Sequence, residues 1–173
     1  MQKIAIIGNA GGGKTTLSRK LSARLNIPLY HVDTYQFIAG MQIRPHVETI
    51  KILSDIQEEE TWLIDGYGPL DIIEKRFGLA DTIIFIDFPL WRHYWWSLKR
   101  QITSLWNPRK ELPEGCFEAN VQQTYKLFRT IWKVHTKMRP ELLRILNRPQ
   151  LRDKVRSVRS YNQFKKICEG GIE

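Results

Sequence analysis

Short apolar runs alternate along this chain with longer stretches in which apolar residues recur every three or four positions. Five runs have the length of strands, and those in the middle of the set are apolar throughout, as is typical of strands covered on both faces. They lie at 4–7, 28–32 (ending at Asp33), 62–68 (a strand with its exit turn), 82–89 and 154–158. The last run is the weakest and is expected at an edge. This alternation predicts an α/β fold with parallel strands.

The stretches with helical spacing predict the helices and the faces that they bury. They cover about 17–25, 45–58, 91–105, 118–138, 140–146 and 160–168, with Asn26 expected to end the first and Ser160 to cap the last. The expected faces are Leu17, Leu21 and Leu25; Val47, Ile50, Leu53 and Ile56; Trp91, Trp95, Leu98, Ile102 and Leu105; and Val121, Tyr125, Phe128 and Trp132. Five of the six tryptophans lie between residues 91 and 132. We expect most of them to pack in the core or at a hinge, and the alternative is that these aromatic residues and the cations between them bind single-stranded nucleic acid.

The stretch from Gly8 to Thr15 fits the pattern G-x-x-x-x-G-K-[ST] and stands between the first strand and the first helix. Glycines let the backbone curl so that successive N–H groups face an anion, and the helix N-terminus adds its positive dipole. Lys14 should reach the β- and γ-phosphates of a nucleotide, and Thr15 should ligate Mg²⁺. The alternative is a glycine-rich turn with a chance Lys-Thr. The predicted ATP-binding residues are Gly8, Asn9, Ala10, Gly11, Gly12, Gly13, Lys14, Thr15 and Thr16.

Three aspartates stand where predicted strands end: Asp33, Asp65 and Asp87. In an open α/β sheet, ligands bind outside the carboxyl ends of the strands. Asp33 could bind a substrate hydroxyl, act as general base or hold Mg²⁺ through water, or it could simply cap a helix. Asp65 is the better candidate for the carboxylate that faces Mg²⁺ near Thr15, Asp87 competes for that role, and either could be an ordinary turn residue.

Residues that could face the phosphoryl acceptor lie near two of these strand ends. Gly66 and Gly68 permit a tight turn that a ligand could approach closely, with Tyr67 between them. Arg44 stands at the entrance of the second helix and could clamp an acceptor anion, or it could be a surface arginine. We assign Asp33, Arg44, Gly66 and Tyr67 to the acceptor side.

Residues 91–138 resemble a helical lid, because two helices flank a basic loop at 107–115 that begins and ends near prolines. Phosphoryl transfer needs positioning and charge neutralisation, and arginines on a closing lid supply both. The candidates are Arg92, Arg100 and Arg109; the alternative is that such cations only solvate a helical surface. With Lys14 and Asp33, Arg100 and Arg109 form the predicted catalytic set. A basic stripe follows on the second helix, at Lys126, Arg129, Lys133 and Lys137.

Composition narrows the class of protein. At 173 residues the chain is most simply one domain spanning 1–173, with a net charge of +9. Residues 1–91 hold 9 Lys/Arg and 11 Asp/Glu, whereas 92–173 hold 18 and 7, so the basic half could serve a nucleotide, an anionic substrate or nucleic acid. We expect no membrane span, no secretory signal and, because Cys116 and Cys168 form no metal pattern, a cytoplasmic protein with reduced thiols.

The chain resembles the nucleotide-kinase branch of P-loop proteins, and within it the adenylate-kinase-related family called DNA topology modulation proteins. The motifs behind this are the P-loop, His31-Val32-Asp33, Trp62 to Gly66, Ile86 to Pro89, and Arg109 to Glu118. The resemblance implies a five-stranded parallel sheet of adenylate-kinase type, with helices on both faces and a helical lid, and an ATP·Mg²⁺ donor. This chain departs from the family at Tyr67-Gly68 and at residues 37–40, where an acceptor would bind.

The resulting hypothesis is a P-loop kinase that moves the γ-phosphoryl of ATP to a small, nucleotide-like acceptor, with the loop near Arg159 and Ser160 beside the base. A second hypothesis comes from another class: an ATP-binding protein that contacts nucleic acid through its basic half. A P-loop ATPase or a nucleotide switch without an acceptor is a third.

Overall fold

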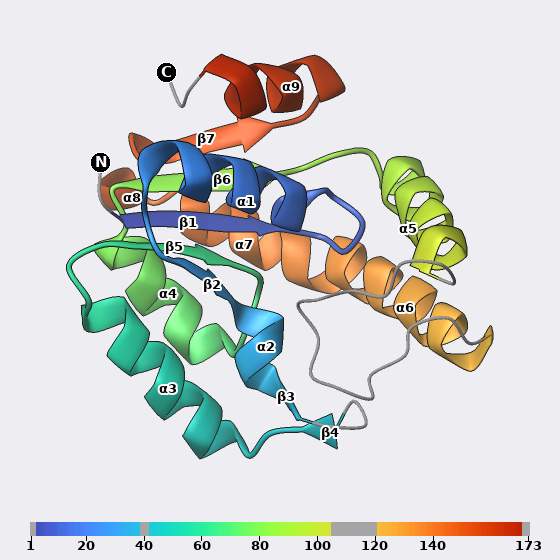
Figure 1. Cartoon of the computed structure of the whole chain (residues 1–173), viewed down its shortest axis with the longest axis horizontal. Helices are drawn as coiled ribbons and strands as arrows, with labels where there is room; N and C mark the ends of the chain where they lie inside the picture. The colour runs from blue at the N-terminus through green and yellow to red at the C-terminus, as the bar shows by residue number, and fades with distance from the viewer. Residues whose placement is uncertain (1–2, 39–41, 105–120, 171–173) are drawn as a thin grey trace.

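The computed structural model of the chain describes residues 3–38, 42–104 and 121–170, and its centre is a five-stranded parallel sheet (Figure 1). The strand order is β2-β5-β1-β6-β7. The strands are β1 Lys3–Gly8, β2 Leu29–His31, β5 Trp62–Asp65, β6 Thr82–Ile86 and β7 Val155–Val158. The fold class predicted from the sequence is confirmed, including the edge position of the last strand.

Parallel pairing brings the chemical groups at the strand ends to one edge of the sheet. His31 is in register with Asp65, Asp65 with Ile6, and Gly8 with Ile86. The P-loop, which follows Gly8, therefore lies between the ends of β5 and β6. Asp65 and the residue after Ile86, Asp87, flank it on either side.

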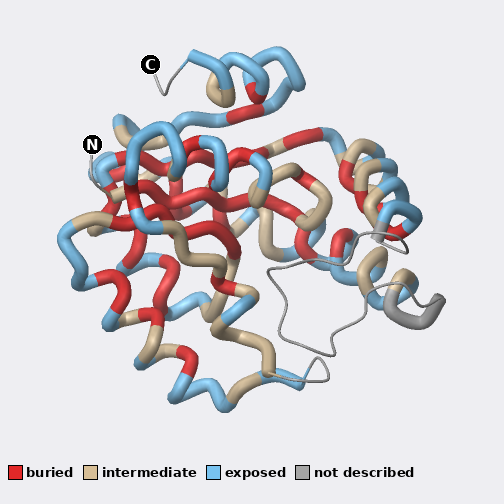
Figure 2. Tube along the Cα trace, in the orientation of Figure 1, coloured by how far each residue is buried: buried red, intermediate tan, exposed pale blue. Residues whose placement is uncertain are grey.

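Helices cover both faces of the sheet, so the three central strands, β5, β1 and β6, are almost entirely buried, whereas the edge strands β2 and β7 are partly exposed (Figure 2). On one face, Leu17 and Leu21 of α1 (Lys14–Leu25) and Phe164 of α9 (Tyr161–Gly170) pack on β1 and β6. On the other, a larger core joins α3 (His46–Glu58), α4 (Leu70–Leu79), α7 (Arg139–Leu146) and α8 (Pro149–Arg152) to the sheet. Asn26 ends α1 in the left-handed conformation (φ 53°), as predicted for that cap.

Two helices stand at the carboxyl edge of the sheet, over the P-loop: α5 (Leu90–Ser104) and α6 (Val121–Lys133). A five-residue π-helix, η2 (Val134–Met138), continues α6 into α7, so residues 121–146 are helical without a break. The prediction of one helix to residue 138 and another from Pro140 is thus correct in type, although no turn separates them. Arg109, Cys116 and the 107–115 loop lie outside the described residues.

The segment after β2 differs from the prediction. The strand ends at His31, and Val32–Gln36 forms the short helix α2, which leads into a small antiparallel pair, β3 (Phe37–Ile38) and β4 (Gln42–Ile43). Asp33 therefore lies in the first turn of a helix, with His31 at the N-cap position, and not at the end of a strand. The prediction that Val47 belongs to the buried face of α3 is also wrong. Val47 is 79% exposed, because it lies in the first turn of the helix, beyond the edge of the core.

The burial of α5 is the reverse of the predicted pattern. Its buried face is polar and consists of His93, Ser97 and Gln101. Trp91 and Trp95, which were expected in the core or at a hinge, are exposed, as is Trp132 on α6. The reason is the neighbour: α5 packs on the backbone of the P-loop, and a glycine-rich loop presents peptide groups rather than an apolar surface. Within the described residues, no helix has the length and hydropathy needed to cross a membrane.

Candidate active site

The P-loop forms a tight turn in which the glycines have conformations and contacts that other residues could not adopt. Gly11 has φ +69°, and a Cβ there would collide with Ser97 Oγ and lie 2.6 Å from the His93 carbonyl oxygen. Gly13 has φ +79° at the N-cap position of α1, so the free N–H groups of that helix begin beside it. Lys14 Nζ donates to the Asn9 carbonyl at 3.1 Å, which folds its ammonium back over the loop. Thr15, with Thr16 after it, occupies the first turn.

Both helices over the loop are attached to it by hydrogen bonds. His93 Nδ1 of α5 donates to the Ala10 carbonyl at 2.9 Å, and Asn9 Nδ2 donates to the Ile131 carbonyl of α6 at the same distance. Burial lowers the pKa of His93 to about 4, so the imidazole is neutral at physiological pH and holds its proton on Nδ1. The loop and the two helices therefore form one hydrogen-bonded unit.

Asp65, at the end of β5, is bound by Ser18, which lies one helical turn after Thr15 in α1. Ser18 Oγ donates to Asp65 Oδ2 at 2.6 Å, and His31 Nδ1 donates to Oδ1 at 2.9 Å. Ser18 also lies 3.1 Å from the Thr15 carbonyl oxygen. The carboxylate is buried, and these two donors fix its orientation beside the start of α1.

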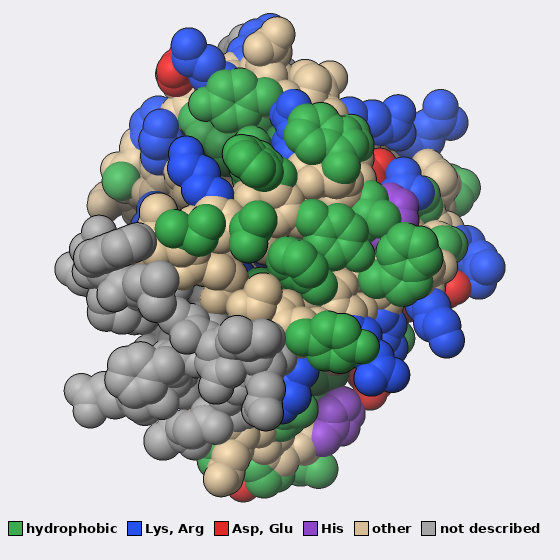
Figure 3. Space-filling model, turned by 90° about the vertical axis from the view of Figure 1, so that its right-hand side faces the viewer, with side chains coloured by type: hydrophobic (Ala, Val, Ile, Leu, Met, Phe, Trp, Pro, Cys, Tyr) green, Lys and Arg blue, Asp and Glu red, His purple; other side chains and the backbone are tan. Residues whose placement is uncertain are grey.

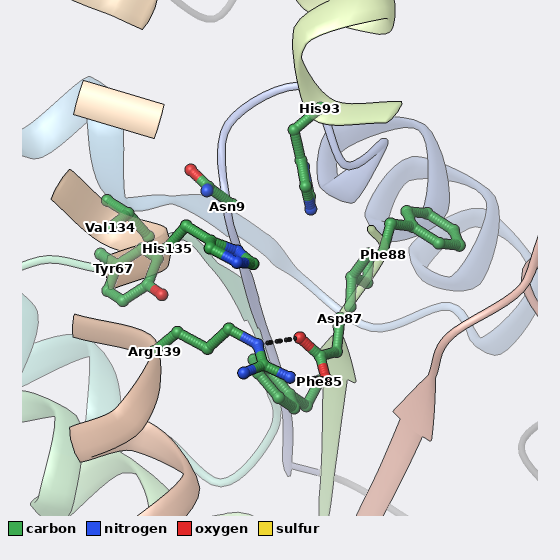
Figure 4. A pocket seen from close by; sticks show the side chains of 10 residues that line it. Asn9, Tyr67, Phe85, Asp87, Phe88, His93, Val134, His135 and Arg139 are labelled. Carbon is green, nitrogen blue, oxygen red and sulfur yellow. Dashed lines mark hydrogen bonds and ion pairs between the residues drawn. The ribbon is translucent and has the colours of Figure 1, made fainter. Parts of the chain in front are cut away.

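Asp87 is held differently, by a cation. Arg139 at the start of α7 donates from Nε and Nη2 to the two carboxylate oxygens at 2.6 and 2.8 Å, and this pairing raises the pKa of the guanidinium. Arg159 lies 3.9 Å from the same carboxylate. Figure 4 shows the pair in a small cavity of about 10 Å³, room for about one water molecule. Asn9, Tyr67, His93 and His135 also line this cavity.

The residues assigned to the acceptor do not share one environment. Tyr67 lies in the cavity beside Asp87, where burial and then that carboxylate raise the pKa of its phenol above the usual range. Gly66 packs against Val32 at the start of α2. Arg44 donates from Nε to the Tyr35 carbonyl at 2.9 Å and lies 3.6 Å from Glu48, so it links α2 to α3.

Arg92 is set in an aromatic cluster. Its guanidinium lies 5.3, 5.2 and 5.5 Å from the ring centres of Phe88, Trp91 and Trp96, so three cation–π contacts hold it beside the P-loop side of α5. Arg100 is half-buried in the second half of α5. The loop at Arg159 and Ser160 is ordered by Gln163, whose side-chain oxygen accepts both backbone N–H groups at 2.8 and 3.0 Å, while Ser160 caps α9 as predicted.

Several residues of this site were not foreseen from the sequence: Ser18, His31, His93, Arg139 and Arg76. Arg76 of α4 is fully buried beneath the Gly66 turn and donates to the Gly66 carbonyl at 2.8 Å. Burial lowers its pKa to about 10, so it remains a cation, and its field acts on Asp65. The sequence does contain a signal for the burial of Arg76, because this residue falls on the same helical face as the apolar Ile72 and Phe77.

Comparison with solved structures supports the fold. The shikimate kinase from Acinetobacter baumannii, in complex with shikimate, is 14% identical with a TM-score of 0.53, covering 98% of this chain and 89% of that chain. The shikimate kinase from Aquifex aeolicus is 19% identical with a TM-score of 0.50, covering 96% of this chain and 92% of that chain. The shikimate kinase from Bacteroides thetaiotaomicron is 14% identical with a TM-score of 0.51, covering 97% of this chain and 94% of that chain. No family model and no curated protein matches the sequence. The chain thus has the P-loop NTPase fold of adenylate-kinase type.

Proposed function

We propose that this protein is a P-loop kinase that transfers the γ-phosphoryl group of ATP to a small acceptor. One observation carries the proposal: Lys14 and Thr15 begin a helix directly after a glycine loop, and the next turn of that helix binds the buried Asp65 through Ser18. Two cation-rich helices, α5 and α6, are attached to the same loop by hydrogen bonds. Phosphoryl transfer depends mainly on positioning and on neutralising charge, which this arrangement offers.

The residues divide into two groups by what they would do. Residues 8–16 would bind the polyphosphate through backbone N–H groups, with Lys14 as the fixed cation. Arg100 and Arg109 would neutralise charge on the transferring group when the 91–138 lid closes, and exclusion of water would favour transfer over hydrolysis. Arg92, with Phe88 and Trp96, and the loop at Arg159 and Ser160 would face the base.

Thr15 and one of the two buried aspartates would hold Mg²⁺, which supplies positive charge against the phosphate oxygens when bound. The residues present fit such an ion, since an oxygen-only set with few protein ligands is what Mg²⁺ takes. We favour Asp65, because Ser18 and His31 each donate to one of its oxygens close to Thr15, whereas Arg139 engages both oxygens of Asp87.

The acceptor would lie on the α2 side of the site. Asp33 and Arg44 would bind it, with Asp33 near enough to the end of β2 to take the proton of a hydroxyl group. The resemblance to the DNA topology modulation family leaves the acceptor undefined, and our proposal is a nucleotide-like acceptor and a cytoplasmic enzyme. The bound shikimate in one structural neighbour makes small hydroxy acids the second class to test.

Calorimetry with ATP and Mg²⁺, followed by a coupled assay over nucleoside monophosphates and hydroxy acids, tests this proposal. We expect Lys14→Ala to reduce turnover at least about a hundredfold, since it removes the cation on the transferring phosphate, while Lys20→Ala, on the exposed side of α1, leaves it unchanged. Asp65→Asn should raise the Mg²⁺ concentration needed for half-maximal rate. ATP hydrolysis at one rate with and without every acceptor would instead indicate an ATPase.

The charge asymmetry favours one alternative, an ATP-binding protein that associates with nucleic acid through residues 92–173. A gel-shift titration across salt concentrations separates the two. Binding that weakens steeply with salt would support the alternative, and no binding at physiological ionic strength would favour the kinase.

A further inference from the structure

The helix α5 turns its apolar side away from the rest of the molecule. Because its polar face covers the P-loop, Trp91, Trp95, Leu98 and Ile102 are 62, 60, 41 and 51% exposed. Apolar side chains scattered singly over a surface need no explanation, but four on one face of one helix do.

The exposed surface continues onto α6. Tyr125 and Trp132 are 70 and 55% exposed, and a groove of about 420 Å³ runs between the two helices. An edge-to-face contact between the rings of Tyr94 and Phe128, with centres 5.0 Å apart, joins the helices at its floor. Trp91, Tyr94, Trp95, Leu98 and Phe128 line the groove. We call Trp91, Trp95, Leu98, Ile102, Tyr125 and Trp132 the aromatic face; Figure 3 views the molecule from this side, where large apolar side chains gather among cations.

The charged residues of α5 and α6 all have one sign. The sequences of these two helices contain no Asp or Glu. Apart from Arg92 and Arg100, which are assigned above to the nucleotide site, their cations are Lys99, Lys126, Arg129 and Lys133. A surface that covers the aromatic face must therefore accept both apolar side chains and the positive charge of these helices.

We propose that the aromatic face binds an anionic lipid membrane surface. Trp and Tyr side chains prefer the boundary between headgroups and acyl chains, Leu98 and Ile102 would enter the apolar layer, and Lys or Arg side chains would reach anionic headgroups. A second copy of this chain would bring two cationic faces together, which is unfavourable. Single-stranded nucleic acid would stack on the aromatic rings, but the aliphatic side chains and the apolar lining of the groove give it nothing to bind.

This surface is separate from the nucleotide site, so the proposal does not depend on the kinase activity. The side of α5 that carries His93 faces the P-loop, whereas the aromatic face points away from it. A membrane-bound protein would keep its P-loop off the lipid surface.

The test uses the full-length protein and vesicles of phosphatidylcholine with or without phosphatidylglycerol. We expect sedimentation with the anionic vesicles, a blue shift of tryptophan emission on binding, and weakening of binding as salt rises. The variants Trp91→Ser/Trp95→Ser and Lys126→Glu/Arg129→Glu should each lower the partition coefficient at least about tenfold. The matched control Val47→Ser/Lys51→Glu, on the exposed side of α3, should leave it unchanged.

Three results would overturn the proposal. The first is the absence of binding to anionic vesicles by protein whose circular dichroism shows it to be folded. The second is binding to single-stranded DNA, but not to vesicles, that both double variants weaken; it would assign the surface to nucleic acid. The third is an equal loss of vesicle binding in the α3 control, which would show a nonspecific charge effect.

Discussion

At the scale of single residues, the site depends on buried polar groups whose partners lie far away in the sequence. Asp65 is held by Ser18 and His31, 47 and 34 positions away, and Asp87 by Arg139, 52 positions away. Each pairing satisfies a carboxylate that would otherwise be costly to bury. The P-loop motif predicted that Lys14 and Thr15 begin a helix directly after the glycine loop, because that placement depends on local spacing alone, whereas their roles toward ATP stay a prediction. The partners of the aspartates depend on strand register, for His31, and on how α1 and α7 pack on the sheet, for Ser18 and Arg139; a single sequence specifies neither.

His93 provides a prediction at this scale. Its folded-state pKa of about 4 lies below the ordinary value of 6.5, because burial disfavours the imidazolium. Between these values the unfolded chain binds a proton that the folded chain does not, so stability falls as pH falls from about 6.5 toward 4. We expect His93 to contribute up to about 3 kcal/mol to that loss. Urea unfolding across this range should show a shallower loss for His93→Gln than for the native chain; parallel curves would mean that His93 is protonated without cost.

At the scale of elements, helix type and position followed from the sequence more reliably than the direction that each helix faces. The periodicity predicted α5 nearly to its ends, yet it placed Trp91 and Trp95 inside. An apolar stripe marks the buried face only when the neighbouring surface is apolar. Here the neighbour is the peptide backbone at Gly11, which requires the small Ser97 and the hydrogen-bonding His93. In β2 the strand ended two residues early because α2 begins at Val32.

The close contact between α5 and the P-loop gives the second prediction. Gly11→Ala would force a side chain into a left-handed conformation and against Ser97 and the His93 carbonyl group. We expect a loss of about 3 kcal/mol in the free energy of unfolding, and an ATP affinity lower by at least about tenfold as the loop is displaced. The control is Gly78→Ala in α4, where the added Cβ would have no atom within 4 Å apart from the neighbouring residues and the backbone of its own helix. This variant should be more stable by about 0.8 kcal/mol. Similar stability of the two variants would show that α5 yields easily.

At the scale of the whole molecule, the last helix completes the nucleotide loop at the beginning of the chain. The side chain of Phe164 in α9 lies where a Cβ on Gly13 would come within 3.0 Å of its ring, and it packs with Phe88 and Trp96. Parallel topology explains this arrangement, because β7 pairs with β6, the neighbour of β1, and α9 after it packs against α1. The sequence predicted the helix and its Ser160 cap, and the contact with Gly13 emerges only from the packed fold.

Phe164 therefore gives a prediction for both stability and nucleotide binding. Replacing it by alanine leaves a cavity between α9, α1 and the P-loop, and we expect a loss of about 3 kcal/mol in the free energy of unfolding. Because the ring also supports the loop at the N-cap of α1, Phe164→Ala should weaken ATP binding several-fold at temperatures where the variant is folded. Lys166→Ala, an exposed position on the same helix, is the control for both measurements. Calorimetry that finds native ATP affinity in a destabilised Phe164→Ala variant would restrict α9 to covering the sheet, with no part in shaping the nucleotide loop.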